Sequence, residues 1–249
     1  VSHPIPRRDN SYLTRISAPE GVRYAALFTH AAGRPIELNQ ENSRAYGKLL
    51  ARIHTCLDSR PEDPRRFHLD LEYLVDAPLR YVEPYLADRG EDLDYLQRVG
   101  SELKSRLDGL LPVARPEYGC CHGDHYGGNV HMDGTGRMTA FDFDCYGYGW
   151  RAYDLAVFLA KNAQLDGVSK AGEARSRRRW ESFLAGYSSL RAPGEEELRA
   201  VQLFVPVRLI WRLGMEAQVE DWGRNWAIDG SLDRDIDFIK YWMASRPLP

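Results

Sequence analysis

Residues 122–129 read His-Gly-Asp-His-Tyr-Gly-Gly-Asn, and residues 142–144 read Asp-Phe-Asp. Between them, Asp133-Gly134-Thr135-Gly136 has the composition of a tight hairpin turn. The first stretch is therefore predicted to be a loop that enters a short hairpin. Asp142 is predicted to lie where the second strand of that hairpin ends, beside the loop that carries Asp124.

This spacing of an Asp, an Asn and a later Asp is what phosphoryl transfer from a Mg-nucleotide requires. We predict that Asp124 is the catalytic base, because it follows Gly123 in a tight loop where no bulky neighbour blocks a substrate hydroxyl. Asn129 and Asp142 offer the carbonyl and carboxylate oxygens that Mg²⁺ prefers, so we predict them as metal ligands. Asp144 is a second candidate, for the metal or for the acceptor.

The same residues also occur in ordinary turns, where Asp or Asn beside Gly is common. Function is favoured by the conjunction of the Asp-to-Asn spacing, the hairpin and the Asp-x-Asp that follows. His122 is predicted to order the loop through hydrogen bonds rather than to react. Asp154 opens a predicted helix, and two roles for it stay open: an N-cap, or a carboxylate that accepts N–H groups from the loop.

Composition narrows the class of protein. The chain has 249 residues, with 43% hydrophobic and 28% charged, as in a soluble globular protein of one large or two small domains. A formal charge of −3 gives no basic field for a nucleic acid. With no run of ~20 apolar residues and no secretory pattern, we predict a cytoplasmic protein with no membrane or nucleic-acid partner. Zinc at the Cys and His residues near 120–125 is disfavoured, because no second ligand pair follows.

Periodicity predicts strands first and helices afterwards. Residues 11–16 and 24–29 are predicted to form a hairpin, and Asn39 to cap an amphipathic helix that ends near residue 57. The other predicted helices are 67–89 (broken at Pro78 and Pro84), 93–110, 154–163, 174–190, 195–218 and 233–245. Four late tryptophans are predicted mainly to pack these helices, with one or two of them lining an acceptor pocket: Trp211, Trp222, Trp226 and Trp242.

Three motifs in this order, H-G-D-x-x-x-x-N, F-D-F-D and Y-D-L-A, resemble those of the aminoglycoside phosphotransferase/choline kinase family. The segment Leu50–His54 also matches a helix of that family. The segments 208–212 and 221–223 are faintly similar to the bacterial stress-response Ser/Thr kinase and type II homoserine kinase branches. The resemblance covers roughly residues 10–245, and the block 122–156 is its specific part.

The resemblance implies an α+β, protein-kinase-like fold. Residues 1–35 would be a small, truncated β-rich N-terminal lobe with its hinge, and 36–249 a large, mainly helical C-terminal lobe. It implies the roles given above for Asp124, Asn129 and Asp142, a loop-supporting role for Asp154, and ATP and Mg²⁺ as cofactors. Residues Leu27, Phe28 and Thr29 would lie in the hinge that binds adenine through backbone groups.

One departure from the family pattern concerns the phosphates. No Lys precedes Lys48, and no Gly-rich turn precedes residue 21, so the expected phosphate-covering loop and its Lys are not seen. Either upstream sequence is absent from this chain, which we favour, or the protein holds nucleotide without that clamp. We expect the chain as given to bind Mg-nucleotide weakly and to turn over slowly or not at all. The predicted activity is phosphoryl transfer to a hydroxyl of a small molecule such as an aminoglycoside, amino alcohol or homoserine-like metabolite. A Ser/Thr protein kinase and a non-catalytic binding module are the alternatives. Four acidic residues suggest a cationic acceptor: Asp144, Glu216, Glu220 and Asp221.

Overall fold

The computed structural model describes residues 1–60, 62–218 and 230–246, and the chain divides into two compact units. The first unit comprises Val1–Glu37 and Tyr126–Asp142, and the second comprises Leu38–His125 and Phe143–Pro249. Two segments distant in sequence thus build the smaller unit. No described helix combines the length and apolar character that crossing a bilayer requires.

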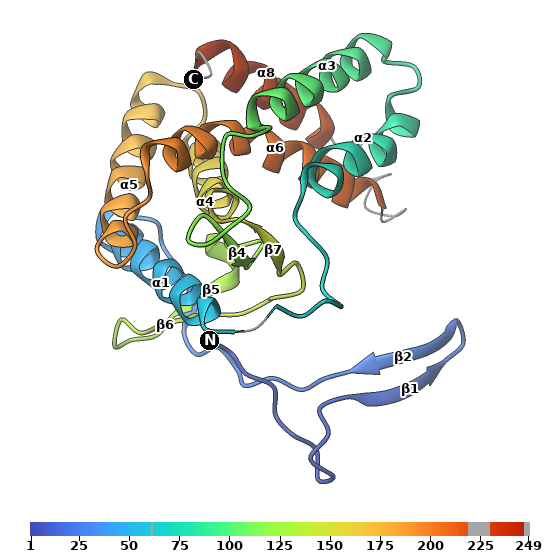
Figure 1. Ribbon diagram of the computed structural model, residues 1–249, viewed down its shortest axis with the longest axis vertical. Helices are drawn as coiled ribbons and strands as arrows, with labels where there is room; N and C mark the ends of the chain where they lie inside the picture. The colour runs from blue at the N-terminus through green and yellow to red at the C-terminus, as the bar shows by residue number, and fades with distance from the viewer. Residues whose placement is uncertain (61, 219–229, 247–249) are drawn as a thin grey trace. The chain divides into compact units, whose positions relative to one another are not determined.

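The first unit contains two antiparallel sheets. Strands β1 (Thr14–Ala18) and β2 (Gly21–Ala25) form an exposed hairpin, which Figure 1 shows in blue. The hairpin predicted at 11–16 and 24–29 is therefore present, but its second strand ends earlier. The other sheet has the order β3-β5-β6, from Arg34–Pro35, Val130–Met132 and Met138–Ala140.

The second unit is mainly helical. Its long helices are α1 (Gln40–Asp58), α3 (Gly90–Leu107), α4 (Arg151–Asp166), α5 (Lys170–Ser188), α6 (Glu195–Gln218) and α8 (Ser231–Ser245). Shorter turns are η1 (Glu72–Asp76), α2 (Ala77–Val82) and η2 (Glu83–Leu86), and strands β4 (Tyr118–Cys121) and β7 (Gly147–Trp150) pair antiparallel. Helix α1 packs on α5 and helix α4 on α6 (Figure 1).

Local sequence explains where these helices begin and break. Asn39 caps α1 as predicted, its side chain accepting the Asn42 N–H at 2.8 Å. Pro78 and Pro84 each lie in the first turn of a short helix, where a proline has no intrahelical N–H bond to lose. The predicted break of 67–89 into pieces follows from this placement.

Candidate active site

The loop that carries Asp124 is fixed by the carboxylate of Asp154, from the first turn of α4. Its Oδ2 accepts the His122 N–H at 2.7 Å and its Oδ1 accepts the Gly123 N–H at 2.8 Å. Asp154 is fully buried, and the N-cap of α4 is Trp150. The sequence left two roles open for Asp154. The structure shows that its carboxylate accepts N–H groups from the loop and that it is not the N-cap of the helix.

His54 on α1 supports this carboxylate from the other side. Its Nε2 lies 2.9 Å from Asp154 Oδ2, and its Nδ1 lies 2.9 Å from the Tyr187 hydroxyl. Since the carboxylate only accepts, Nε2 carries the proton and Nδ1 accepts from the hydroxyl. Burial lowers the pKa of His54 to about 4. Burial alone would raise the pKa of Asp154, but the bond from His54 holds it well below its usual range.

His54 had no functional feature in the sequence beyond its place in the matched segment Leu50–His54. A further signal was available, because residue 54 lies one helical turn after the buried Leu50. A polar side chain on a buried stripe needs a hydrogen-bond partner. The partner is 100 residues away in sequence, so periodicity could not name it.

Gly123 allows the loop to pass close to another backbone segment. Its φ is +82°, and a Cβ there would lie 2.1 Å from the Cys145 carbonyl oxygen. Only glycine combines this conformation with this approach. Next to it, the buried ring of His122 lies 4.2 Å from the Phe143 ring and 4.9 Å from the ring of His125. The loop is therefore held by side-chain packing as well as by Asp154.

Asp124 itself is half-buried and forms an ion pair with Arg208 of α6. Arg208 is 8% exposed, and its guanidinium carbon lies 4.3 Å from the centroid of the Trp211 ring. Sequence reasoning noted this segment only as a faint resemblance. The available signal was a single charge within the apolar run 203–210, because a cation buried in such a run needs an anionic partner.

Asn129 and Asp142, the predicted metal ligands, belong to the first unit. Asn129 is 5% exposed. Its backbone carbonyl oxygen, not its side-chain amide, accepts the Phe141 N–H at 3.0 Å. Strand pairing Val130↔Ala140 therefore brings Asn129 and Asp142 to one end of the β5–β6 hairpin. Asp142 is exposed and has a φ of +62°. An amide and a carboxylate in this arrangement have the oxygen chemistry that a divalent cation such as Mg²⁺ takes.

The predicted hinge residues pair with the start of the chain. Ile5 N–H donates to the Leu27 carbonyl at 2.7 Å, and Thr29 N–H donates to the His3 carbonyl at 2.9 Å. In this antiparallel pattern the N–H and C=O of Phe28, opposite Pro4, point to the other edge. Adenine binding by Leu27, Phe28 and Thr29 stays a prediction, and Phe28 is the residue whose backbone groups best suit it.

Asp144 is exposed in the second unit, where its carbonyl oxygen accepts a hydrogen bond from Arg66. Glu216 is half-buried near the end of α6, and Trp211 and Trp242 are buried. The other residues suggested for an acceptor pocket or a cationic acceptor lie outside the described residues: Glu220, Asp221, Trp222 and Trp226.

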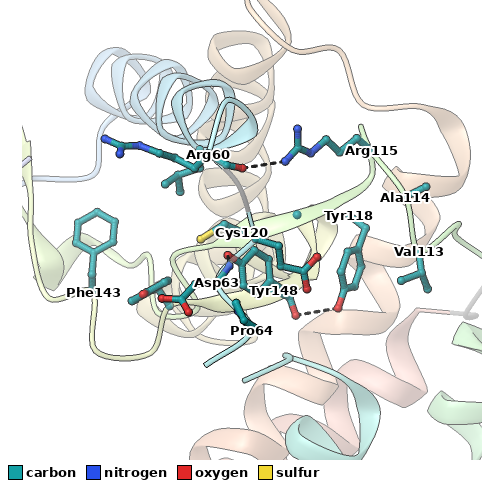
Figure 2. Close-up of a pocket in the computed structure, with 14 residues that line it drawn as sticks. Arg60, Asp63, Pro64, Val113, Ala114, Arg115, Tyr118, Cys120, Phe143 and Tyr148 are labelled. Carbon is teal, nitrogen blue, oxygen red and sulfur yellow. Dashed lines mark hydrogen bonds between the residues drawn. The ribbon is translucent and has the colours of Figure 1, made fainter. Parts of the chain in front are cut away.

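A pocket of about 790 Å³ opens in the second unit beside β4. Figure 2 shows its wall, where the Tyr118 hydroxyl donates to the Tyr148 carbonyl at 3.1 Å and Arg115 donates to the Arg60 carbonyl at 3.1 Å. Phe143 lines the pocket, but Asp124 is not among its lining residues. The pocket therefore does not by itself provide an acceptor site for the predicted base.

The fold and the loop define a class: proteins with the protein-kinase-like fold. Residues 4–201 match the phosphotransferase enzyme family, and the chain belongs to that family. The family and the α+β fold predicted from the motifs are thus confirmed.

One relative and two solved structures illustrate what the chain is similar to. An uncharacterized protein of Deinococcus radiodurans is 32% identical over 87% of this chain and 61% of its own length, so the chain spans about three fifths of that relative. A solved microcompartment-associated aminopropanol kinase has a TM-score of 0.78 at 20% identity, covering 100% of this chain and 77% of its own. The amicoumacin kinase hAmiN, solved with AMP-PNP, Ca²⁺ and Ami, has a TM-score of 0.73 at 21% identity. The match covers 100% of this chain and 74% of that kinase. At these identities the solved structures bear on the fold alone.

Proposed function

We propose that this chain carries the catalytic loop of an ATP-dependent O-phosphotransferase that acts on a hydroxyl of a small molecule. The observation that carries the proposal is the loop of Asp124, fixed through the buried Asp154 in a chain of the phosphotransferase enzyme family. The names of the structural neighbours support it: one is an aminopropanol kinase, and another is a kinase bound to AMP-PNP and a divalent cation.

In the proposed reaction, Asp124 accepts the proton of the acceptor hydroxyl. The acceptor oxygen then bonds to the γ-phosphorus, the bond from that phosphorus to the β–γ bridging oxygen breaks, and ADP leaves with the electron pair. We assign Asn129 and Asp142 to hold Mg²⁺, which supplies charge neutralisation when bound. The protein's contribution is mainly positioning, and the two loop N–H groups bonded to the buried Asp154, those of His122 and Gly123, support this.

The acceptor is a small hydroxylated metabolite or antibiotic in this proposal. The name of one neighbour, an aminopropanol kinase, supports an acceptor that carries an amine, and the name of the other, an amicoumacin kinase, supports a small molecule. A panel of amino alcohols, aminoglycosides and hydroxy-amino acids, tested for ATP consumption, would identify the class. If the protein phosphorylated a Ser-containing peptide but none of the small alcohols, a small-molecule acceptor would be contradicted.

The test of the catalytic role is Asp124→Asn, in the protein with any flanking sequence that its gene encodes. We expect kcat to fall at least ~10²-fold while the Kd for nucleotide stays the same, because only proton acceptance and alignment are removed. Asp94→Asn, an exposed isosteric change on α3, is the control and should keep full activity. Unchanged turnover in Asp124→Asn would remove that residue from the role of base.

A further inference from the structure

Arg208 is held in one place by its surroundings. It lies within α6, is 8% exposed, and stacks over the ring of Trp211 at 4.3 Å. Its Nη2 donates to Asp124 Oδ1. Its Nη1 is buried, and the Tyr153 side chain is a close neighbour of the guanidinium. A charge in this environment has almost no freedom to move.

The partner carboxylate belongs to a loop and not to a helix. The side chain of Asp124 is 21% exposed, against 10% for Arg208. A charge-assisted bond from a packed guanidinium is shorter and stronger than one between neutral groups. Because the bond is made through Oδ1, it restricts rotation of the carboxylate about its own axis. The rigid helix α6 therefore sets the orientation of a loop side chain 84 residues away.

We propose that Arg208 is a positioning residue for phosphoryl transfer and acts by orienting the carboxylate of Asp124. This inference rests on the function proposed above, in which Asp124 is the base. A general base works only when its oxygen points at the proton that it accepts, and a displacement of about 1 Å can cost ~10²-fold in rate. Arg208 thus affects the rate through Asp124 and not through contact with the substrate.

The competing role for a cation at this place is direct stabilisation of the transferred phosphoryl group. The two roles differ in a double-mutant cycle. If Arg208 acts through Asp124, its removal should change little once Asp124 is already Asn. If it binds the phosphoryl group, the two losses should multiply.

The experiment compares kcat and KM of the protein, including any flanking sequence that its gene encodes, with those of R208M, D124N and R208M/D124N. We expect R208M to lower kcat ~10- to 100-fold with KM for ATP and acceptor unchanged. The double variant should be within ~3-fold of D124N. R212M is the matched control, because Arg212 lies one turn further along α6 and pairs with a different buried acid, Asp235. Its kcat should stay within ~3-fold of wild type.

The possible results distinguish the positioning role of Arg208 from the function proposed above. Multiplying losses, or an R208M variant as fast as wild type, would overturn the positioning role and leave the proposed function standing. A wild-type protein that consumes no ATP with any acceptor would overturn both. If R208M does not fold, R208K replaces it in the cycle. Lys keeps the charge but loses the planar fork, so R208K should keep the wild-type KM and have a kcat below that of wild type.

Discussion

Asp142 combines two properties at the scale of single residues: a predicted role in metal binding and an unusual backbone. A φ of +62° is uncommon for residues other than glycine, although Asp and Asn tolerate it better than most. Residues held in such conformations often cluster at functional sites, so the outlier itself supports a functional hypothesis. It also complicates any test by substitution, because most replacements add strain to the loss of the carboxylate.

A pair of variants separates the two effects. Asp142→Ala and Asp142→Gly both remove the carboxylate, but only Ala is strained at this φ. We expect both to lose Mg-dependent nucleotide binding to a similar extent, as measured by calorimetry with Mg²⁺ and with EDTA. Normal binding in the Gly variant would show that the backbone and not the carboxylate matters. Loss of binding in Asp144→Ala instead would move the metal role to Asp144.

The contact between α1 and α5 carries the next prediction, at the scale of elements. A Cβ on Gly47 would lie 2.0 Å from the Phe183 carbonyl oxygen, and Gly186 meets the Arg44 carbonyl oxygen in the same way at 1.9 Å. Two glycines thus let the two helix backbones touch. The obstacle is backbone on both sides, so no side chain can turn away to make room.

Gly47→Ala should therefore destabilise the protein, although alanine normally favours a helix interior by about 1 kcal/mol. We expect the free energy of unfolding to fall by ~1–3 kcal/mol, the usual cost of overpacking, in urea denaturation. Gly90→Ala at the start of α3 is the matched control, since a Cβ there meets nothing within 4 Å. The close approach would be refuted if both variants were equally stable.

The elements show what the sequence could and could not predict. Helices such as α1 follow from a local cap at Asn39 and an apolar stripe, so periodicity located them. The strand predicted over 24–29 was placed less well. Its apolar run continues to Thr29, but pairing with β1 stops at Ala25 and residues 27–29 pair with 3–5 instead. Strand ends depend on partners, and partners are not local.

The same distinction separates the site residues, now at the scale of the whole molecule. The loop residues of 122–129 could be predicted as site residues because they lie in one short stretch of sequence. Their supports were missed because they come from other helices: His54 from α1 and Arg208 from α6. A motif was therefore enough to propose which side chains react, whereas the residues that hold the loop could be identified only from the fold.

The buried His54–Asp154 pair connects this support to the stability of the whole molecule. The pKa of His54 is about 4 in the folded protein because of burial, against about 6.5 for an ordinary histidine. Between these values the unfolded chain binds a proton that the folded chain does not. Stability is therefore lost as pH falls from about 6.5 to about 4, by ~3 kcal/mol for this histidine. The pKa of His125 is shifted in the same direction by burial, so it adds to the loss.

Asp154 is an acid and not a base, but it too makes the folded protein less stable as pH falls, at lower pH than the histidines. Its lowered pKa stabilises the folded state above the ordinary value for Asp, and that contribution is lost only as pH falls below about 4. The interval between pH 6.5 and 4 consequently reports on the histidines. We expect the urea-derived free energy of unfolding, measured from pH 7.5 down to 4.5, to fall less steeply in His54→Gln than in wild type. His68→Gln, at an exposed histidine, should keep the wild-type slope. Equal slopes in wild type and His54→Gln would mean that His54 is not held neutral in the folded protein.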